Sequence, residues 1–216
     1  MKTDRTKNPK PLDEPDKALA IREQMSELAG QYWQIVHQQQ DFVAGDHAVR
    51  VSGKVFGPQE LQNLVDASLD FWLTTGRFND AFEDALAKTI RVKHTLTTNS
   101  GSSANLIAVS ALCSPILGDR QLLPGCEVIT CATGFPTTVN PILNNNLVPV
   151  FVDVDIASYN IDVGQLDAAL SDKTRAIVIA HTMGNPFNLD VIKQFADKHS
   201  LWLIEDCCDA LGSTYQ

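Results

Sequence analysis

The spacing of the apolar positions changes near residue 91. Up to residue 91 the apolar positions recur at helical intervals, and we predict helices over residues 18–40, 58–73 and 81–90. Pro58 stands at the start of the second helix, where the missing N–H of proline costs no hydrogen bond. The first part of the sequence therefore predicts a mainly helical segment.

From residue 92 onward, short apolar runs alternate with segments of helical period. Strands are predicted over 92–98, 127–131, 148–154, 176–181 and 201–206, and helices over 103–112, 135–144, 163–171 and 191–200. Strands this apolar are covered on both faces, and short links between strand and helix indicate a mostly parallel, doubly wound α/β sheet. Ligands of such sheets bind beyond the carboxyl ends of the strands.

The two patterns predict the domain organisation. Residues 1–16 are polar with three prolines and are expected to be a mobile tail. Residues 17–91 form the helical segment, and residues 92–216 form the large α/β domain that carries the candidate ligand site.

Composition narrows the function. Of the 216 residues 44% are apolar and 20% charged, which is ordinary for a globular protein. Asp and Glu number 26 against 17 Lys and Arg, a net charge of -9, which excludes nucleic acid and an anionic membrane surface as partners. The N-terminal residues lack an apolar leader, and no run approaches the roughly 18 apolar residues of a membrane helix. We therefore expect a cytoplasmic protein that acts on a small molecule or binds another protein.

Five cysteines, an odd number without a leader, are expected to be reduced thiols. Cys126 and Cys131 have the spacing that opens a plant-type iron–sulfur motif, but Gly134 stands where the next ligand would fall. We expect a structural role for this pair and predict no metal ligands.

Gly101, Ser102 and Ser103 follow the first predicted strand, where a helix begins. Glycine allows a tight turn, and the free N–H groups and hydroxyls of such a helix end can hold a phosphate. A serine N-cap preceded by a turn glycine explains the same residues equally well.

Two further strand ends carry polar or aromatic residues. Phe135 follows the strand 127–131, where its ring could lie flat on a planar ligand or pack as an ordinary core residue. His181 opens the turn 181–186, and a histidine there is either a hydrogen-bonded structural residue or part of a site.

Asp206 ends the last strand, where an unpaired carboxylate is costly to bury. It needs a donor or cationic partner, and a protonated pyridine nitrogen would serve. The alternative is a cap on the following turn, through Asp206 or Asp209. A helix N-terminus that can bind phosphate, the aromatic ring of Phe135, the polar turn at His181 and the carboxylate of Asp206 together predict a site for pyridoxal or pyridoxamine phosphate.

Several of these motifs together resemble the fold-type I PLP enzymes, and among them the DegT/DnrJ/EryC1/StrS sugar aminotransferase family. The resemblance runs from about Val49 to Gln216, through NSGSSAN, PGCEVIT, VPVFVDVD, YNID, HTMGNP and LWLIEDCCDALGS. It implies an aspartate aminotransferase-like large domain. By resemblance, Gly101 and Ser102 match the phosphate-binding residues, Phe135 the aromatic residue on the ring and Asp206 the acid at the ring nitrogen.

Asp209 favours one branch of that family. Sugar aminotransferases typically have Gln or His there, whereas the CDP-4-keto-6-deoxyglucose 3-dehydrases have Asp. Resemblance to that branch implies C-3 dehydration of a CDP-sugar with pyridoxamine phosphate, in the synthesis of 3,6-dideoxyhexoses for lipopolysaccharide. It further implies a 2Fe-2S cluster, an NAD(P)H-dependent flavin iron–sulfur reductase as partner, and a homodimer.

Gln216 precedes the segment where the family has its Schiff-base lysine, a histidine in this branch, and also precedes the cluster cysteines and the C-terminal domain. We therefore expect an N-terminal fragment that cannot complete the active site or hold the cluster. Two other hypotheses remain: a PLP-dependent nucleotide-sugar aminotransferase, and a truncated non-catalytic binding or interaction protein. The end product among the dideoxysugars does not follow from the sequence.

Overall fold

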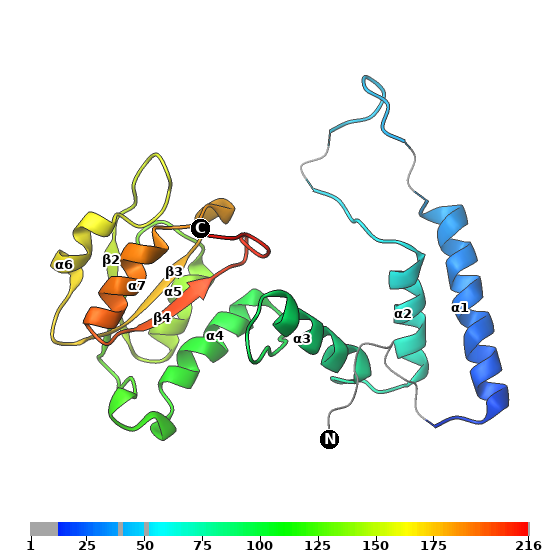
Figure 1. Cartoon of the computed structure of the whole chain (residues 1–216), viewed down its shortest axis with the longest axis horizontal. Helices are drawn as coiled ribbons and strands as arrows, with labels where there is room; N and C mark the ends of the chain where they lie inside the picture. The colour runs from blue at the N-terminus through cyan, green and yellow to red at the C-terminus, as the bar shows by residue number, and fades with distance from the viewer. Residues whose placement is uncertain (1–12, 39–40, 50–51, 216) are drawn as a thin grey trace. The chain divides into compact units, whose positions relative to one another are not determined.

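The computed structural model describes residues 13–38, 41–49 and 52–215 (Figure 1). The chain divides into two compact units between Leu96 and Thr97. Most of the predicted tail lies outside the described residues, and the first helix begins at Asp16. Within the described ranges, none of the helices combines the length and the apolar character needed to cross a membrane.

Three helices make up the N-terminal unit: α1 (Asp16–Val36), α2 (Pro58–Leu69) and α3 (Arg77–Thr89). Helices α1 and α2 pack side by side (Figure 1). Pro58 occupies the first turn of α2, as predicted, and the Glu60 carboxylate accepts a hydrogen bond from the Gly57 N–H at 2.6 Å. Helix α2 ends before the predicted residue 73, because Phe71 adopts a left-handed φ of 46° that a helix cannot continue.

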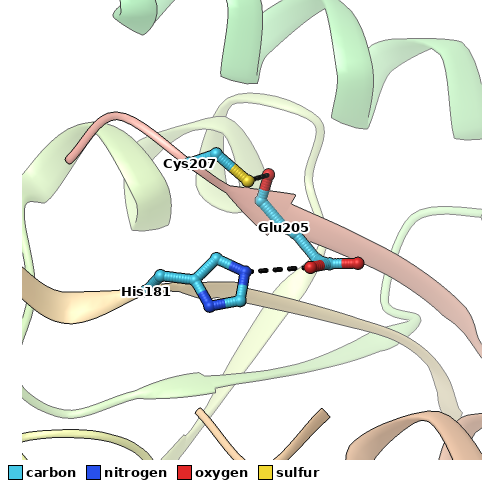
Figure 2. Close-up of side chains that lie close together, drawn as sticks. All are labelled: His181, Glu205 and Cys207. Atoms are coloured by element: carbon cyan, nitrogen blue, oxygen red, sulfur yellow. Dashed lines mark hydrogen bonds and ion pairs between the residues drawn. The ribbon is translucent and has the colours of Figure 1, made fainter. Parts of the chain in front are cut away.

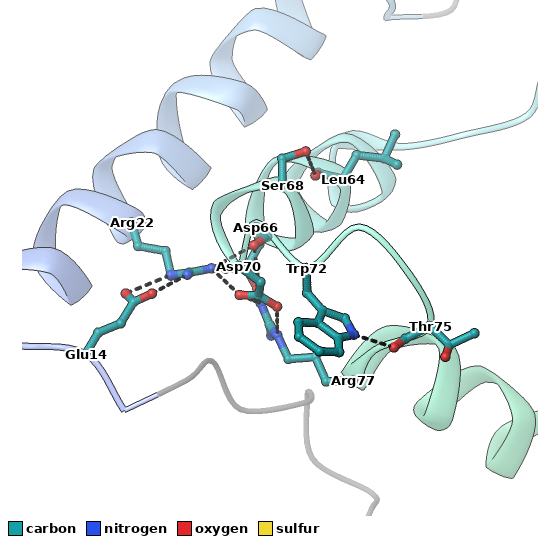
Figure 3. A network of polar contacts seen from close by, with 9 residues as sticks. All are labelled: Glu14, Arg22, Leu64, Asp66, Ser68, Asp70, Trp72, Thr75 and Arg77. Atoms are coloured by element: carbon teal, nitrogen blue, oxygen red, sulfur yellow. Dashed lines mark hydrogen bonds and ion pairs between the residues drawn. The ribbon is translucent and has the colours of Figure 1, made fainter.

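Two arginines, one buried and one half-buried, hold the helices of this unit together (Figure 3). Arg22 on α1 is 7% exposed, and its guanidinium contacts Asp66 at 2.5 Å and Asp70 at 3.1 Å. The Glu14 carboxylate contacts the same guanidinium at 2.6 Å. Arg77, the first residue of α3, contacts Asp66 and Asp70 at 2.6 and 2.7 Å. Charges are tolerated at such burial when they are paired in this way, and the hydrophobic pattern carries no sign of the network.

A parallel four-stranded sheet, in the order β2-β1-β3-β4, forms the centre of the second unit. Its strands are β1 (Glu127–Cys131), β2 (Val148–Val152), β3 (Thr174–Ala180) and β4 (Trp202–Asp206). The helices are α4 (Gly101–Leu112), α5 (Pro136–Asn144), α6 (Leu166–Ala169) and α7 (Leu189–Lys198). Short 3-10 turns cover Pro115–Arg120, Val163–Gln165 and Thr182–Gly184.

Alternate strand residues face opposite layers of helices. One core, between the sheet and helices α4 and α5, includes Val128, Val178 and Ile142. The other core, between the sheet and helices α6 and α7, includes Ile129 and Ile192. The predicted parallel sheet with helices on both faces is therefore confirmed.

The predicted strand over residues 92–98 is wrong. The Val92 N–H donates to the Ala87 carbonyl at 2.9 Å, and the Thr95 hydroxyl donates to the Glu83 carbonyl at 2.5 Å. These bonds tie the segment to α3. Because no strand of the described residues pairs with it, the segment forms no ladder despite its strand-like pattern.

Candidate functional site

Three of the predicted residues follow the carboxyl ends of strands, whereas Gly101 and Ser102 begin α4 and follow no strand of the described residues. Phe135 comes after β1, His181 after β3, and Asp206 closes β4. Parallel strands end at one edge of a sheet, so the loops that follow them gather there. Backbone hydrogen bonding joins two of these ends, because the His181 N–H donates to the Asp206 carbonyl at 3.1 Å.

The carboxylate of Asp206 accepts three hydrogen bonds. Its Oδ2 accepts from the side-chain amide of Asn105 in α4 and from the hydroxyl of Thr138 in α5, both at 2.8 Å. Its Oδ1 accepts from the Cys208 N–H at 3.1 Å. Asp206 therefore caps the turn after β4, and the two buried donors supply the partners that a carboxylate in this position requires.

Sequence reasoning missed Asn105 and Thr138, which are 9% and 4% exposed. A signal was present for Asn105: it interrupts an apolar run one helical turn after Gly101, on the same face of α4. Thr138 carried no such signal. Its importance follows from its burial against β4, which depends on how α5 packs on the sheet.

Helix α4 begins at Gly101, and its N-cap is Ser100, whose hydroxyl accepts a hydrogen bond from the Ser103 N–H at 3.2 Å. A serine therefore caps the helix, but it precedes the glycine, whereas the alternative interpretation placed the capping serine after a turn glycine. Gly101 has no left-handed φ, so the expected tight turn does not explain it. A Cβ added there would meet no atom within 4 Å. Gly101 and Ser102 are exposed at the positive end of a twelve-residue helix, with open space at the glycine.

Phe135 is the N-cap residue of α5 and is 71% exposed. It is therefore not the core residue of the alternative interpretation. Its carbonyl accepts a hydrogen bond from the Thr138 N–H at 3.0 Å, which ties the residue to the first turn of α5.

His181 is a structural partner of Glu205 (Figure 2). The imidazole is 6% exposed, its Nε2 lies 2.9 Å from the Glu205 carboxylate, and its ring stacks on Phe187 with centroids 4.1 Å apart. Its Nδ1 is buried and has no partner among the described residues. The hydrogen-bonded interpretation of His181 therefore agrees with the geometry.

Cys207 lies beside this pair (Figure 2). Donor atoms of His181, Glu205 and Cys207 all lie within 4.8 Å of one another, a residue set that could hold a metal ion. Burial, and then the charges of Glu205 and Asp206, raise the pKa of the Cys207 thiol, which disfavours the thiolate that a metal needs. The absence of metal ligands stays a prediction.

The backbone of Asp209, in the loop after β4, packs against Gly184 in the turn after β3. Gly184 has a left-handed φ of 77°, and a Cβ added to it would lie 2.6 Å from the Asp209 carbonyl oxygen. Only glycine fits this contact. The side chain of Asp209 is exposed.

This edge of the sheet fits a pyridoxal or pyridoxamine phosphate in three respects. The N-terminus of α4 offers N–H groups to a phosphate, and the space at Gly101 is open. The carboxylate of Asp206 stands at a strand end with its orientation fixed. The Phe135 ring is exposed and available to a planar ligand.

Residues 56–216 match the DegT/DnrJ/EryC1/StrS aminotransferase family. Among curated proteins, the chain is 61% identical over 196 residues to "Lipopolysaccharide biosynthesis protein RfbH" of Salmonella typhimurium, covering 91% of this chain and 45% of that protein. It is 48% identical over 183 residues to "dTDP-4-dehydro-2,6-dideoxy-D-glucose 3-dehydratase" of Saccharopolyspora spinosa, covering 83% and 40%. The chain thus spans less than half the length of these relatives.

A solved structure with the same fold is GDP-4-keto-6-deoxymannose-3-dehydratase with a trapped PLP-glutamate geminal diamine. The TM-score is 0.70 and the identity 31%, over 78% of this chain and 43% of that one. The fold is therefore that of the fold-type I PLP enzymes.

Proposed function

Because this chain belongs to the DegT/DnrJ/EryC1/StrS aminotransferase family, we propose that its gene product is a sugar 3-dehydrase that uses pyridoxamine phosphate. Its substrate is CDP-4-keto-6-deoxyglucose, and its product leads to 3,6-dideoxyhexoses of lipopolysaccharide. The 61% identity to a protein named for lipopolysaccharide biosynthesis carries this proposal, and the 48% identity to a sugar 3-dehydratase supports it. Asp209, the residue expected of the dehydrase branch, agrees with both.

The positions of the described residues support a proposed role for each. Gly101 and Ser102 bind the phosphate at the N-terminus of α4, where backbone N–H groups and the helix dipole favour an anion. Phe135 covers one face of the ring, and Asp206 keeps the ring nitrogen protonated. When bound, the cofactor supplies an amine for the 4-keto carbon and a ring that withdraws electrons. The cytoplasm is its proposed location.

The proposed reaction removes the 3-hydroxyl and needs two electrons. An NAD(P)H-dependent flavin iron–sulfur reductase supplies them one at a time through a 2Fe-2S cluster of the complete gene product. A homodimer is the proposed assembly. We assign no residue of this chain to the histidine position that replaces the family's lysine. We also assign none of its residues as a cluster ligand.

Incubation of the complete gene product with pyridoxamine phosphate, its reductase, NADH and CDP-4-keto-6-deoxyglucose tests the proposal. We expect loss of the C-3 hydroxyl, detected by mass spectrometry of the sugar, and no product when the reductase is omitted. Accumulation of a 4-amino sugar with glutamate as donor would contradict dehydration and support the aminotransferase alternative, which the family's name favours.

The binding-protein hypothesis rests on the apolar residues exposed on α1. Leu28 is 61% exposed and Ile35 84% exposed, an arrangement that suits a protein partner. Under that hypothesis the 216-residue chain would form a stable, monodisperse species that binds no pyridoxal phosphate, which size-exclusion chromatography and a calorimetric titration measure directly.

A further inference from the structure

The hydrogen bonds to Asp206 are distributed unevenly between its two oxygens. An ionised carboxylate has about four acceptor positions, two on each oxygen. Two donors occupy Oδ2, from Asn105 and Thr138 at 2.8 Å each. Among the residues that the structure describes, Oδ1 has one donor, the Cys208 N–H at 3.1 Å. Oδ2 is therefore filled, and Oδ1 retains one acceptor position.

Both donors to Oδ2 are fixed by packing. Asn105 is buried in α4, and its amide also donates to the Thr137 carbonyl at 3.3 Å. Thr138 is buried in the first turn of α5, and its N–H is bonded to the Phe135 carbonyl. The same two helices carry the candidate phosphate and ring contacts, because Gly101 lies four residues before Asn105, about 6 Å along the axis of α4. The orientation of Asp206 is thus coupled to both contacts.

Asn105 and Thr138 are neutral donors. An arginine or lysine in their place would orient the carboxylate but would also compensate its negative charge. An amide and a hydroxyl orient Oδ2 and leave the charge of Asp206 available to a cation.

We propose that Asn105 and Thr138 are positioning residues that hold Oδ2 so that the open acceptor position of Oδ1 meets the protonated ring nitrogen of the cofactor. The inference rests on the proposed function, in which Asp206 pairs with that nitrogen. Asn105 and Thr138 act through Asp206. Removal of either donor leaves Oδ2 with one partner, loosens the orientation of the carboxylate and weakens the contact to the ring nitrogen.

Two ligands separate this role from a structural one: pyridoxamine phosphate, and its 1-deaza analogue, in which a C–H replaces the ring nitrogen. Calorimetry gives the dissociation constant of each for the complete gene product and for the variants Asn105→Leu and Thr138→Val. Each variant is expected to raise the dissociation constant of pyridoxamine phosphate by roughly tenfold or more, the effect of one hydrogen bond to a charged group. The constant for the deaza analogue should stay unchanged, and Thr138→Ser should restore wild-type binding of both ligands.

Ser110→Ala is the matched control, because the Ser110 hydroxyl bonds Asn145 at 3.1 Å between the same two helices, away from Asp206. It should change neither constant.

Equal weakening of both ligands in Asn105→Leu and Thr138→Val would overturn the inference, since the residues would then only hold the helices together. If the wild-type protein prefers pyridoxamine phosphate and both variants keep that preference in full, the positioning role of Asn105 and Thr138 is wrong, whereas the proposed role of Asp206 stands. A wild-type protein that does not distinguish the two ligands overturns the proposed role of Asp206 and the inference with it. If Asn105→Leu does not fold, the two Thr138 variants decide.

Discussion

The two adjacent acids at the end of β4 contact different parts of the fold, because successive side chains of a strand point to opposite faces of the sheet. Glu205 reaches the imidazole of His181, whereas Asp206 reaches helices α4 and α5. Neighbours in sequence are therefore separated by the sheet. The stretch 205–209 is not one acidic cluster, and the face of each side chain determines what it can bind.

At Gly184 the structure predicts a strong preference for glycine. Gly184→Ala should destabilise the second unit by roughly 2–4 kcal/mol, because a left-handed φ costs an L-residue about 1–2 kcal/mol and the new Cβ would clash with the Asp209 carbonyl. Urea unfolding measures the loss. Gly212→Ala is the control: Gly212 has a φ of 90°, but a Cβ there meets no atom within 4 Å. Equal losses in the two variants would contradict the clash.

At the scale of elements, the pattern predicted best the strands that pair with one another within the described residues. Strand β1 agrees with the prediction in both bounds, because an apolar run flanked by helices is buried on both sides wherever the sheet forms. Residues 92–98 have the same local character but pair with no described strand. The donors to Asp206 were missed for a related reason: burial of Thr138 is a property of packing, which a local pattern does not encode.

The arginine network of the N-terminal unit predicts that loss of Arg22 lowers the free energy of unfolding more than loss of an exposed, paired lysine. Arg22→Met should lower the free energy of unfolding by roughly 1–3 kcal/mol, since three acids lose a buried partner. The control is Lys193→Met, which removes an i,i+4 pair with Asp197 whose side chains are 61% and 65% exposed, and should cost at most about 0.5 kcal/mol. Chemical denaturation followed by helical circular dichroism compares the two. Similar small losses would show that the network contributes little.

Acid should weaken the same network. Burial alone would raise the pKa of Asp66, but hydrogen bonds and charge from Arg22 and Arg77 outweigh it and lower this pKa below 3.8. The stability that Asp66 contributes is therefore present above pH 3.8 and is lost as the pH falls through the lowered value. Asp66→Asn should be less stable at neutral pH and should show a smaller further loss on acidification. Thermal unfolding across this pH range tests it, and parallel curves for the two proteins would contradict the assignment.

For the whole molecule, the placement of the thiols limits what the chain can bind. Cys131 lies in the core beside α6 and α7, whereas Cys113 and Cys126 pack against the opposite core. Cys207 and Cys208 are exposed after β4. A 2Fe-2S cluster needs four converging ligands, usually thiolates. Burial raises the pKa of Cys131 to about 11, which further disfavours ligation there.

The 216-residue chain, reconstituted with ferrous iron and sulfide under anaerobic conditions and then desalted, should therefore show no iron–sulfur absorption bands. Weak binding of a single iron by His181, Glu205 and Cys207 would be distinguished by Cys207→Ser, which should abolish it. Bands from the chain itself would contradict the separation of its thiols across the sheet. The same measurement on the complete gene product tests the proposed cluster. Bands from that protein that survive replacement of all five cysteines of this chain by serine would assign the cluster to other residues.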